Sequence, residues 1–365
     1  MMKFIPAELK PVYDKIINNT RITAEEGLLL YNFKNPGLLG YFADIVRRRK
    51  NNDRAFFNRN FHIEPTNICI YNCEFCSYRK PAGSPDAWNY SAEEILDIVR
   101  RFDNKPVTEV HIVGGVHPDH DIDYYGRILR MIRDHRPGLH IKAFSAIELD
   151  YIIRKSGLDI RDGLLKLKKD GLGSIPGGGA EIFDEKLRAI ICKDKSSSET
   201  WLRIHEEAHK VGIPSNATML YGHMETYEHR IDHMERLRKL QDSTSGFNSF
   251  IPLKFKMENN KMQQYGEVNI IEDMKNYAVS RIFLDNFPHI KAYWPALGKE
   301  STQLALSFGV DDVDGTIDDT TKIYSMAGAK DQNPSMTTKE ICELIRGAGF
   351  KPVERDTLYN MVKDW

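Results

Sequence analysis

The sequence predicts an α/β fold, and within that class a (β/α)8 barrel of the TIM type, either complete or partly open. Two observations lead to this prediction. From about residue 60, short apolar runs typical of strands alternate about eight times with longer amphipathic runs typical of helices. Glycine or polar residues follow nearly every apolar run, as expected where the loops of a barrel gather at the carboxyl ends of its strands.

The strand candidates are short apolar runs that end in turn residues. They are residues 61–65, 108–113, 139–144, 172–175, 213–219, 247–251, 288–293 and 309–313. The helix candidates between them are residues 91–102, 123–135, 162–171, 198–212, 225–241 and 269–286. Ser91 and Glu94 predict a capping box at the start of the first of these helices. Parallel strands joined by helices form barrels of about 250 residues, which this chain can accommodate.

The segments on either side of the alternating region have a different pattern. Residues 1–55 are predicted to be helical, with Thr23 as the N-cap of one helix. The barrel is expected to span residues 56–317. Residues 318–365 are expected to form a C-terminal extension, with a capped helix at 337–349.

The composition excludes several classes of protein. Its 365 residues include 51 Lys and Arg against 52 Asp and Glu, which gives no support to binding of nucleic acid or of a membrane surface. No apolar run approaches the ~20 residues of a transmembrane helix, and the N-terminal segment lacks the continuous apolar stretch typical of a secretory signal. Five cysteines are too few for a disulfide scaffold, so we expect a cytoplasmic protein whose clustered thiols act as ligands or catalysts. We expect a monomer or a homodimer.

Three cysteines lie close together in one loop. Cys69, Cys73 and Cys76 are spaced C-x3-C-x2-C, directly after the first expected strand. Thiolates select zinc, copper(I) or iron–sulfur clusters, but a structural zinc site requires four ligands. Neither Cys192 nor Cys342 has a second ligand at a typical zinc spacing. A 4Fe–4S cluster on three cysteines leaves one iron open, whereas electron-transfer clusters usually have four cysteines. The pattern therefore favours a catalytic cluster.

This loop resembles the signature of the radical S-adenosylmethionine (SAM) enzymes, with Phe75 in the aromatic position. The resemblance implies a 4Fe–4S cluster held by the three cysteines, with SAM chelated by the open iron as a co-substrate. It also implies reductive cleavage of SAM to methionine and a 5′-deoxyadenosyl radical. Phe75 and Tyr78, both beside the cysteines, are candidates for the SAM site.

Further candidates for the SAM site follow the next strands. Gly114 and Gly115 stand where these enzymes carry a Gly-Gly-Glu-like turn, but here valine takes the third position. Ser145 and Glu148 follow the third strand, where the carboxylate either accepts hydrogen bonds from the SAM ribose or belongs to a helix start. Asn216, on the fifth strand, completes this set.

The glycine loop SIPGGGAE, residues 174–181, lacks the lysine of a phosphate-binding P-loop. Its glycines before a helix suit a nest of backbone N–H groups for an anionic ligand. We therefore expect Gly177 and Gly178 to bind substrate, and the flanking Ser174 and Glu181 to act in catalysis.

Three candidate cations lie near the expected mouth of the barrel. Arg281 and His223 are predicted as catalytic groups and Lys291 as a substrate-binding group. They matter if the substrate carries carboxylates, because fixed cations bind and orient such groups.

The segment HEEAH, residues 205–209, matches the H-E-x-x-H zinc protease pattern. His205 shares a helical face with Trp201 and Ile204, which predicts packing on the barrel wall far from the site. No convincing third ligand follows, so the zinc interpretation is not favoured.

Several segments, in order along the chain, narrow the resemblance. SIPGGGAE, SNATMLYGHMET, LDNFPHIKAYW and MAGAK look like those of the aminofutalosine synthases of menaquinone biosynthesis. This resemblance implies addition of the adenosyl radical to the enol ether of 3-[(1-carboxyvinyl)oxy]benzoate, followed by rearrangement and loss of one carboxylate to give 6-amino-6-deoxyfutalosine. It also implies an electron donor such as flavodoxin or ferredoxin. Cyclic dehypoxanthine futalosine synthase, the FO synthase subunit and a non-enzymatic iron–sulfur protein stay open as alternatives.

Overall fold

The computed structural model describes residues 5–314, 321–330 and 334–365. Its strands form a three-stranded sheet, β2-β3-β4, and a seven-stranded sheet, β10-β9-β1-β8-β7-β6-β5. The strands are β1 (Arg54–Phe57), β2 (Asn60–Ile63), β3 (Glu109–Ile112), β4 (His140–Ala143), β5 (Ser215–Tyr221), β6 (Phe247–Lys254), β7 (His289–Ala292), β8 (Asp312–Val313), β9 (Lys351–Arg355) and β10 (Met361–Asp364).

Most strands of the two sheets form one ring of parallel strands, whereas β10 pairs antiparallel with β9 beside it. A parallel bridge from Lys142 to Ser174 and another from Ile175 to Ser215 connect β4 to β5 through the glycine-loop segment. At the other end of the ring, β8 pairs in parallel with β1, and β2 follows β1 after two residues. The first strand is divided, because β1 pairs with β9 whereas β2 pairs with β3. The predicted α/β barrel is confirmed in a partly open form.

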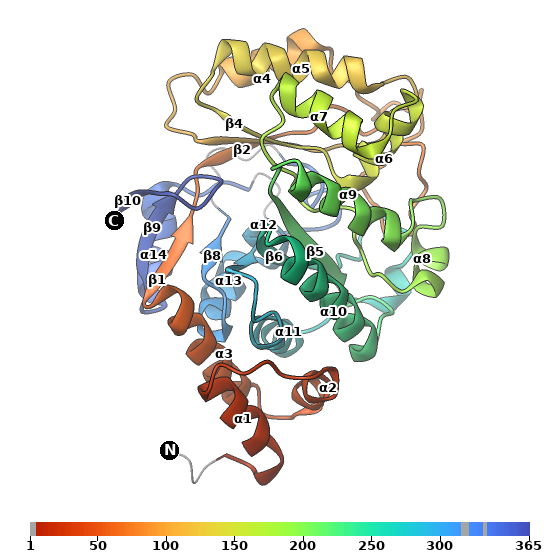
Figure 1. Cartoon of the computed structure of the whole chain (residues 1–365). Coiled ribbons are helices and arrows are strands. Elements are labelled where there is room, and N and C mark those ends of the chain that lie inside the picture. Colours follow the sequence, from red (N-terminus) through yellow and green to blue (C-terminus); the bar gives the residue numbers. More distant parts are fainter. Residues whose placement is uncertain (1–4, 315–320, 331–333) are drawn as a thin grey trace.

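Helices surround this ring (Figure 1). They are α1 (Lys10–Ile17), α2 (Ala24–Asn32), α3 (Pro36–Asn51), α4 (Ala92–Arg100), α5 (Ile122–His135), α6 (Ala146–Lys155), α7 (Ile160–Asp170), α8 (Glu185–Ile191), α9 (Ser198–Lys210), α10 (Tyr227–Thr244), α11 (Ile270–Phe283), α12 (Trp294–Leu297), α13 (Lys299–Ala305) and α14 (Thr338–Gly347). Ser91 and Glu94 form the predicted capping box of α4. Short 3-10 turns lie at Ala7–Leu9, Gln263–Tyr265 and Leu306–Phe308.

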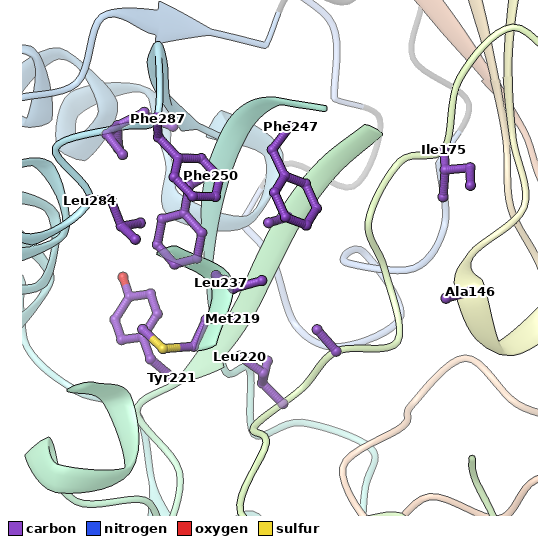
Figure 2. Close-up of a cluster of buried hydrophobic side chains, with 14 of the residues drawn as sticks. Ala146, Ile175, Met219, Leu220, Tyr221, Leu237, Phe247, Phe250, Leu284 and Phe287 are labelled. Carbon is purple, nitrogen blue, oxygen red and sulfur yellow. The ribbon is translucent and has the colours of Figure 1, made fainter. Parts of the chain in front are cut away.

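The packing between strands and outer helices is apolar. Figure 2 shows one part of it, where side chains of β5 and β6 meet residues of α10 and of the turn after α11. These side chains are Met219, Tyr221, Leu237, Phe247, Phe250, Leu284 and Phe287. The rings of Phe247 and Phe287 stack with their centroids 5.4 Å apart. Burial of such large apolar surfaces holds the helices on the outside of the ring.

The inside of the ring is polar at its lower end, where the strands begin. Lys142 on β4 pairs with Glu109 on β3 at 2.7 Å, and both side chains are buried. Arg355 on β9 donates to both carboxylate oxygens of Asp312 at 2.7 and 2.9 Å. Thr357 donates to Glu109 at 2.6 Å, so the C-terminal hairpin fills this end of the barrel.

The segments outside the barrel agree in part with the sequence predictions. Helices α1 to α3 occupy the predicted N-terminal segment, and α3 packs on α11. The first strand begins at Arg54, so the expected boundary at 55–56 falls inside β1. The expected C-terminal helix is present as α14, but the sequence did not predict the strands β9 and β10 that follow it. The expected boundary at 317–318 lies outside the described residues.

None of the helices in the described part of the chain is long and apolar enough to cross a membrane.

Candidate functional site

A cavity of about 300 Å³ opens at the carboxyl ends of the strands, where the barrel prediction placed the functional residues. Its wall is built from the cysteine loop after β2, the loops after β3 and β4, and the glycine loop. The ends of β5 to β8 and the segment 321–327 complete it. Ile251, Leu253, Tyr293 and Tyr324 give it an apolar and aromatic side.

The cysteine loop lies at one end of this cavity. Phe75 and Cys76 line it, whereas Cys73 is buried and Cys69 is partly buried behind it. The loop is fixed through its backbone, because the N–H of Ile70 donates to the carbonyl of Val116 at 3.0 Å. Burial raises the pKa of the Cys73 thiol to about 12, so its thiolate requires a positive partner.

The Gly114–Gly115 turn packs directly against the cysteine loop. A Cβ atom on Gly115 would lie 2.3 Å from the carbonyl oxygen of Ile68, and one on Gly114 would lie 2.8 Å from that of Thr66. The N–H of Gly115 donates to Thr66 at 2.7 Å. Both glycines are therefore required for the close approach of two backbones. Of the two, Gly114 lines the cavity.

Glu148 connects three parts of the site. Its carboxylate accepts hydrogen bonds from the N–H of Gly114 at 3.1 Å and from the N–H and hydroxyl of Ser145, both at 2.7 Å. Glu148 and Ser145 form the capping box of α6, and both also line the cavity. Burial raises the pKa of Glu148 to about 7, although these hydrogen bonds lower it. Glu148 therefore belongs to a helix start, and its predicted contact with the SAM ribose stays a prediction.

The glycine loop packs tightly on β5. Gly177 has a φ of +89°, and a Cβ atom there would lie 2.2 Å from the carbonyl oxygen of Asn216. Gly178 lines the cavity, as does Tyr78, whose hydroxyl donates to Thr66. Gly177 and Asn216 thus hold the loop in place from behind the lining residues.

Ser174 lies below the cavity and does not line it. Its hydroxyl is 2.8 Å from Nε2 of His140 inside the barrel. This position contradicts the catalytic role predicted for Ser174, because residue 174 belongs to the short fourth strand segment and precedes the loop at the rim.

Glu181 pairs with a lysine that sequence reasoning missed. Lys195, in the polar loop between α8 and α9, lies 2.5 Å from the Glu181 carboxylate, and both line the cavity. Its ammonium is also 5.1 Å from the ring centroid of Phe75. Although burial lowers it, the charges of Cys73 and Glu181 hold the pKa of Lys195 above its ordinary value. A fixed cation therefore lies next to the cysteine loop.

Arg281 is not part of the cavity, contrary to its predicted catalytic role. It lies on the outer helix α11, where its guanidinium is completely buried and pairs with Asp311 at 2.7 Å. It also donates to the carbonyls of Gly309 and Phe287. This arginine joins α11 to the loop before β8, which is the end of the barrel opposite to the cavity.

His223 is also behind the cavity wall, contrary to its predicted catalytic role. Its Nε2 lies 3.2 Å from the carbonyl of Leu220, and its Nδ1 lies 3.4 Å from Glu225. Lys291 points into the barrel below the cavity, 3.7 Å from Asp312 and 3.8 Å from Asp314. Asp314 lines the cavity and Lys291 does not, so Lys291 is separated from the cavity by Asp314.

The histidines of HEEAH pack within the barrel wall, as the sequence predicted, and form hydrogen bonds there. His205 and His209 each lie 2.8 Å from the hydroxyl of Ser215, and His209 also contacts Thr244. In the part of the chain that the structure describes, no three His, Cys, Asp or Glu side chains are placed to hold a single metal ion.

Two histidines in the cavity were also missed. His62 on β2 and His111 on β3 both line it. A signal was present in the sequence, since each stands two positions after Asn60 or Glu109 and therefore on the same face of its strand. The sequence contains no such periodic signal for Lys195, because this residue lies in a loop rich in serine and lysine.

Family comparisons agree with this geometry. The family description "Radical SAM superfamily" matches residues 63–237, and "CofH/MqnC C-terminal region" matches residues 244–365. The chain is 42% identical over 361 residues to the aminodeoxyfutalosine synthase of Thermus thermophilus, covering 98% of this chain and 96% of that protein. The chain belongs to the radical SAM superfamily.

Other curated relatives within this superfamily are nearly as similar. A 5-amino-6-(D-ribitylamino)uracil–L-tyrosine 4-hydroxyphenyl transferase from Archaeoglobus fulgidus is 39% identical, covering 90% of this chain and 95% of the relative. The cyclic dehypoxanthine futalosine synthase of Streptomyces coelicolor is 36% identical, covering 97% of this chain and 88% of the relative.

The fold is similar to that of a solved structure. The crystal structure of methylornithine synthase matches with a TM-score of 0.74 at 18% sequence identity, covering 93% of this chain and 96% of that one. This likeness supports the barrel fold alone.

Membership in the superfamily implies a 4Fe–4S cluster and SAM. The residues present fit these groups, because three thiols share one loop and Cys76 faces the cavity. The ammonium of Lys195 lies 5.1 Å from the ring centroid of Phe75 in the same loop, where it would compensate the charge of ligating thiolates.

Proposed function

We propose that this protein is an aminodeoxyfutalosine synthase, which converts 3-[(1-carboxyvinyl)oxy]benzoate and SAM to 6-amino-6-deoxyfutalosine. The observation that carries the proposal is the 42% identity to an aminodeoxyfutalosine synthase over nearly the whole length of both chains. The cavity beside a three-cysteine loop at the mouth of the barrel supports it.

In this proposal Cys69, Cys73 and Cys76 would hold the 4Fe–4S cluster, and the open iron would bind SAM. When bound and reduced, these groups supply a 5′-deoxyadenosyl radical for addition to the enol-ether double bond. The electron donor would be a flavodoxin or ferredoxin, and the location would be cytoplasmic.

The protein's own residues bind and orient the two substrates. Glu148 fixes the Gly114 backbone, so the loop after β3 keeps one position relative to the cysteine loop. Phe75, Tyr78, Gly114, Ser145 and Glu148 line the cavity and would contact SAM. Asn216 and Gly115 would act indirectly, by holding the backbone of these loops.

The opposite wall would exclude water from the reaction. Ile251, Leu253, Tyr293 and Tyr324 present apolar and aromatic surface to the cavity. A carbon radical reacts with most of its surroundings, so a closed site that holds the second substrate beside the radical limits side reactions. Glu181, Lys195 and Gly178 would contact the polar groups of the substrates at the cysteine end.

A second candidate function is that of the hydroxyphenyl transferase, whose Archaeoglobus member is 39% identical to this chain. Both enzymes would share the cluster and the SAM site, and they would differ in the second substrate.

Product analysis under anaerobic conditions tests the proposal. The purified protein is reconstituted with iron and sulfide, reduced, and mixed with SAM and 3-[(1-carboxyvinyl)oxy]benzoate. The expected product is an adenosine–benzoate adduct that lacks one carboxylate, detected by mass. Turnover only with tyrosine and 5-amino-6-(D-ribitylamino)uracil would establish the transferase instead, and intact SAM with a reduced cluster would exclude both.

A further inference from the structure

Two histidines form the part of the cavity wall nearest to the barrel interior. His62 and His111 are register partners on β2 and β3, and Lys142 on β4 is the register partner of His111. The ring centroids of the two histidines are 4.6 Å apart. His62 also meets Tyr293 edge-on, at 6.2 Å between ring centroids. This end, which we call the histidine end, lies on strands and is therefore rigidly placed.

The His111 ring has unused hydrogen-bonding capacity. Its Nε2 atom is buried and has no hydrogen-bond partner among the described residues. A buried polar atom without a partner costs free energy, so native proteins rarely keep one unless a ligand or water satisfies it. His111 lines the cavity, so a bound substrate that packs against its ring would be the nearest candidate for that partner.

Burial and the surrounding charges keep the His111 ring neutral. Burial lowers the pKa of His111, and the nearby His62, Lys142 and Lys291 lower it further, whereas Glu109 raises it. The ring is therefore neutral and donates through one nitrogen without adding a charge of its own. Lys142, the register partner of His111, pairs with Glu109 at 2.7 Å, and the ammonium of Lys291 on β7 lies 3.7 Å from Asp312.

One acidic side chain, Asp314, lines the same end of the cavity. Asn60 donates to it at 3.2 Å, and the Lys291 ammonium lies 3.8 Å from it. The negative charge of Asp314 is therefore compensated from below, and it does not exclude a carboxylate at His111.

We propose that His111 binds the ring carboxylate of the benzoate substrate through Nε2–H, and so sets the direction in which the substrate lies. This inference rests on the proposed function and adds the orientation of the substrate. The ring carboxylate is the group farthest from the enol-ether double bond. With that carboxylate at the histidine end, the aromatic ring lies beside His62 and Tyr293, and the double bond points toward Phe75 and Cys76.

A double-mutant cycle between protein and substrate tests this orientation. Binding of two compounds to the reconstituted, SAM-loaded enzyme is measured by calorimetry: the full substrate, and 2-phenoxyacrylate, which lacks only the ring carboxylate. His111→Phe keeps an aromatic ring and removes the donor. It is expected to weaken binding of the full substrate by about 10- to 100-fold, the range of a hydrogen bond to a charged group. Affinity for 2-phenoxyacrylate should change by less than about twofold.

Controls separate this role from a structural one. His140→Gln changes a neighbouring histidine that is already bonded to Ser174, and it should leave both affinities unchanged. His111→Gln retains an N–H donor and should restore part of the affinity for the full substrate. Iron content and the midpoint of thermal unfolding are recorded for each variant.

Equal weakening for both compounds in His111→Phe would overturn the proposal, since loss of packing affects them alike. No weakening for either compound would also overturn it. If the proposed function itself is wrong, the unmodified enzyme will not convert the full substrate at all. That result is distinct from the binding results that would overturn the role of His111.

Discussion

The two ends of the barrel both contain buried charges, but the charges are arranged differently. At the lower end, Arg281 pairs with Asp311 and Arg355 with Asp312, and the side chains of both pairs are at most 1% exposed. At the cavity, Glu181 and Lys195 also pair, yet 11% and 14% of their side-chain surfaces stay exposed. Access to the cavity, and not burial of a charge, distinguishes the site from the scaffold.

This difference has an energetic basis. The attraction within a buried ion pair at best offsets the free-energy cost of removing its two charges from water. Removal of one partner leaves the other charge buried and uncompensated. At the lower end such pairs fix the relative positions of strands, helix and hairpin, as Arg281 does for α11 and the loop before β8. At the cavity the same kind of pair leaves one face available for a ligand.

The largest expected effect concerns the cysteine loop. Cys73→Ser should lose most of the cluster iron and all measurable activity, because a hydroxyl is a poor ligand for iron–sulfur clusters. Cys192→Ser is the matched control, as Cys192 is also a buried free thiol and its segment contacts the loop through a bond from Glu74 to Ile191. Iron and sulfide analysis after anaerobic reconstitution measures both. Equal iron loss in Cys192→Ser would indicate that Cys192 is a fourth ligand. The three cysteines of the loop would then not hold the cluster alone.

The second largest effect is expected when one cation is removed from each end of the barrel, Arg281 from the lower end or Lys195 from the cavity. Arg281→Met should lower the free energy of unfolding by about 3–5 kcal/mol, because Asp311 is left buried without its main partner. Lys195→Met should cost less stability, since Glu181 keeps access to water in the cavity, but it should reduce activity more. Urea unfolding and turnover are measured for both variants. The reverse ranking in either measurement would contradict the division into scaffold and site.

The smallest expected effect depends on pH and sharpens the contrast between buried and exposed carboxylates. Burial raises the pKa of Glu148 to about 7, so between roughly pH 4.5 and 7 the folded state keeps a proton that the unfolded chain releases. Stability therefore falls as pH rises through this window. Glu148→Gln removes this loss and should gain up to about 3 kcal/mol relative to the unmodified protein between pH 5 and 7.

The matched control is Glu94→Gln, which alters the same capping motif on the surface. The pKa of Glu94 is lowered by its hydrogen bonds to Ser91, so this variant should show no such gain. Urea unfolding at about pH 5 and 7 gives the comparison. Parallel pH profiles for Glu148→Gln and the unmodified protein would show that the buried carboxylate carries no such cost.

Much of the fold could be predicted because apolar runs of strand length alternate with helical periodicity. The run predicted at 108–113 contains β3, and the run at 139–144 contains β4. Strand β9 could not be predicted in this way, since its inner face carries Arg355 and its partner Asp312 lies far away in the sequence. Such a strand is buried by charge pairing and has no apolar alternation.

The site could be predicted where spacing alone defines the chemistry. Three cysteines in one loop indicate a cluster whatever the surroundings are. Lys195 and Arg281 could not be assigned, because the role of a cation depends on which carboxylate and which cavity the fold brings next to it. The sequence favoured Arg281 from an expected position near the mouth, but its helix places it at the opposite end.

The pairing of the first strand with the C-terminal hairpin has a consequence for biosynthesis. Arg54 pairs with Lys351, and Glu109 receives its bond from Thr357, so the ribosome makes one partner of each contact long before the other. Contacts between distant parts of a chain form late in folding. The nascent barrel therefore stays open at its base until synthesis has passed residue 357, and the cysteine loop leaves the ribosome well before the structure that supports it is complete.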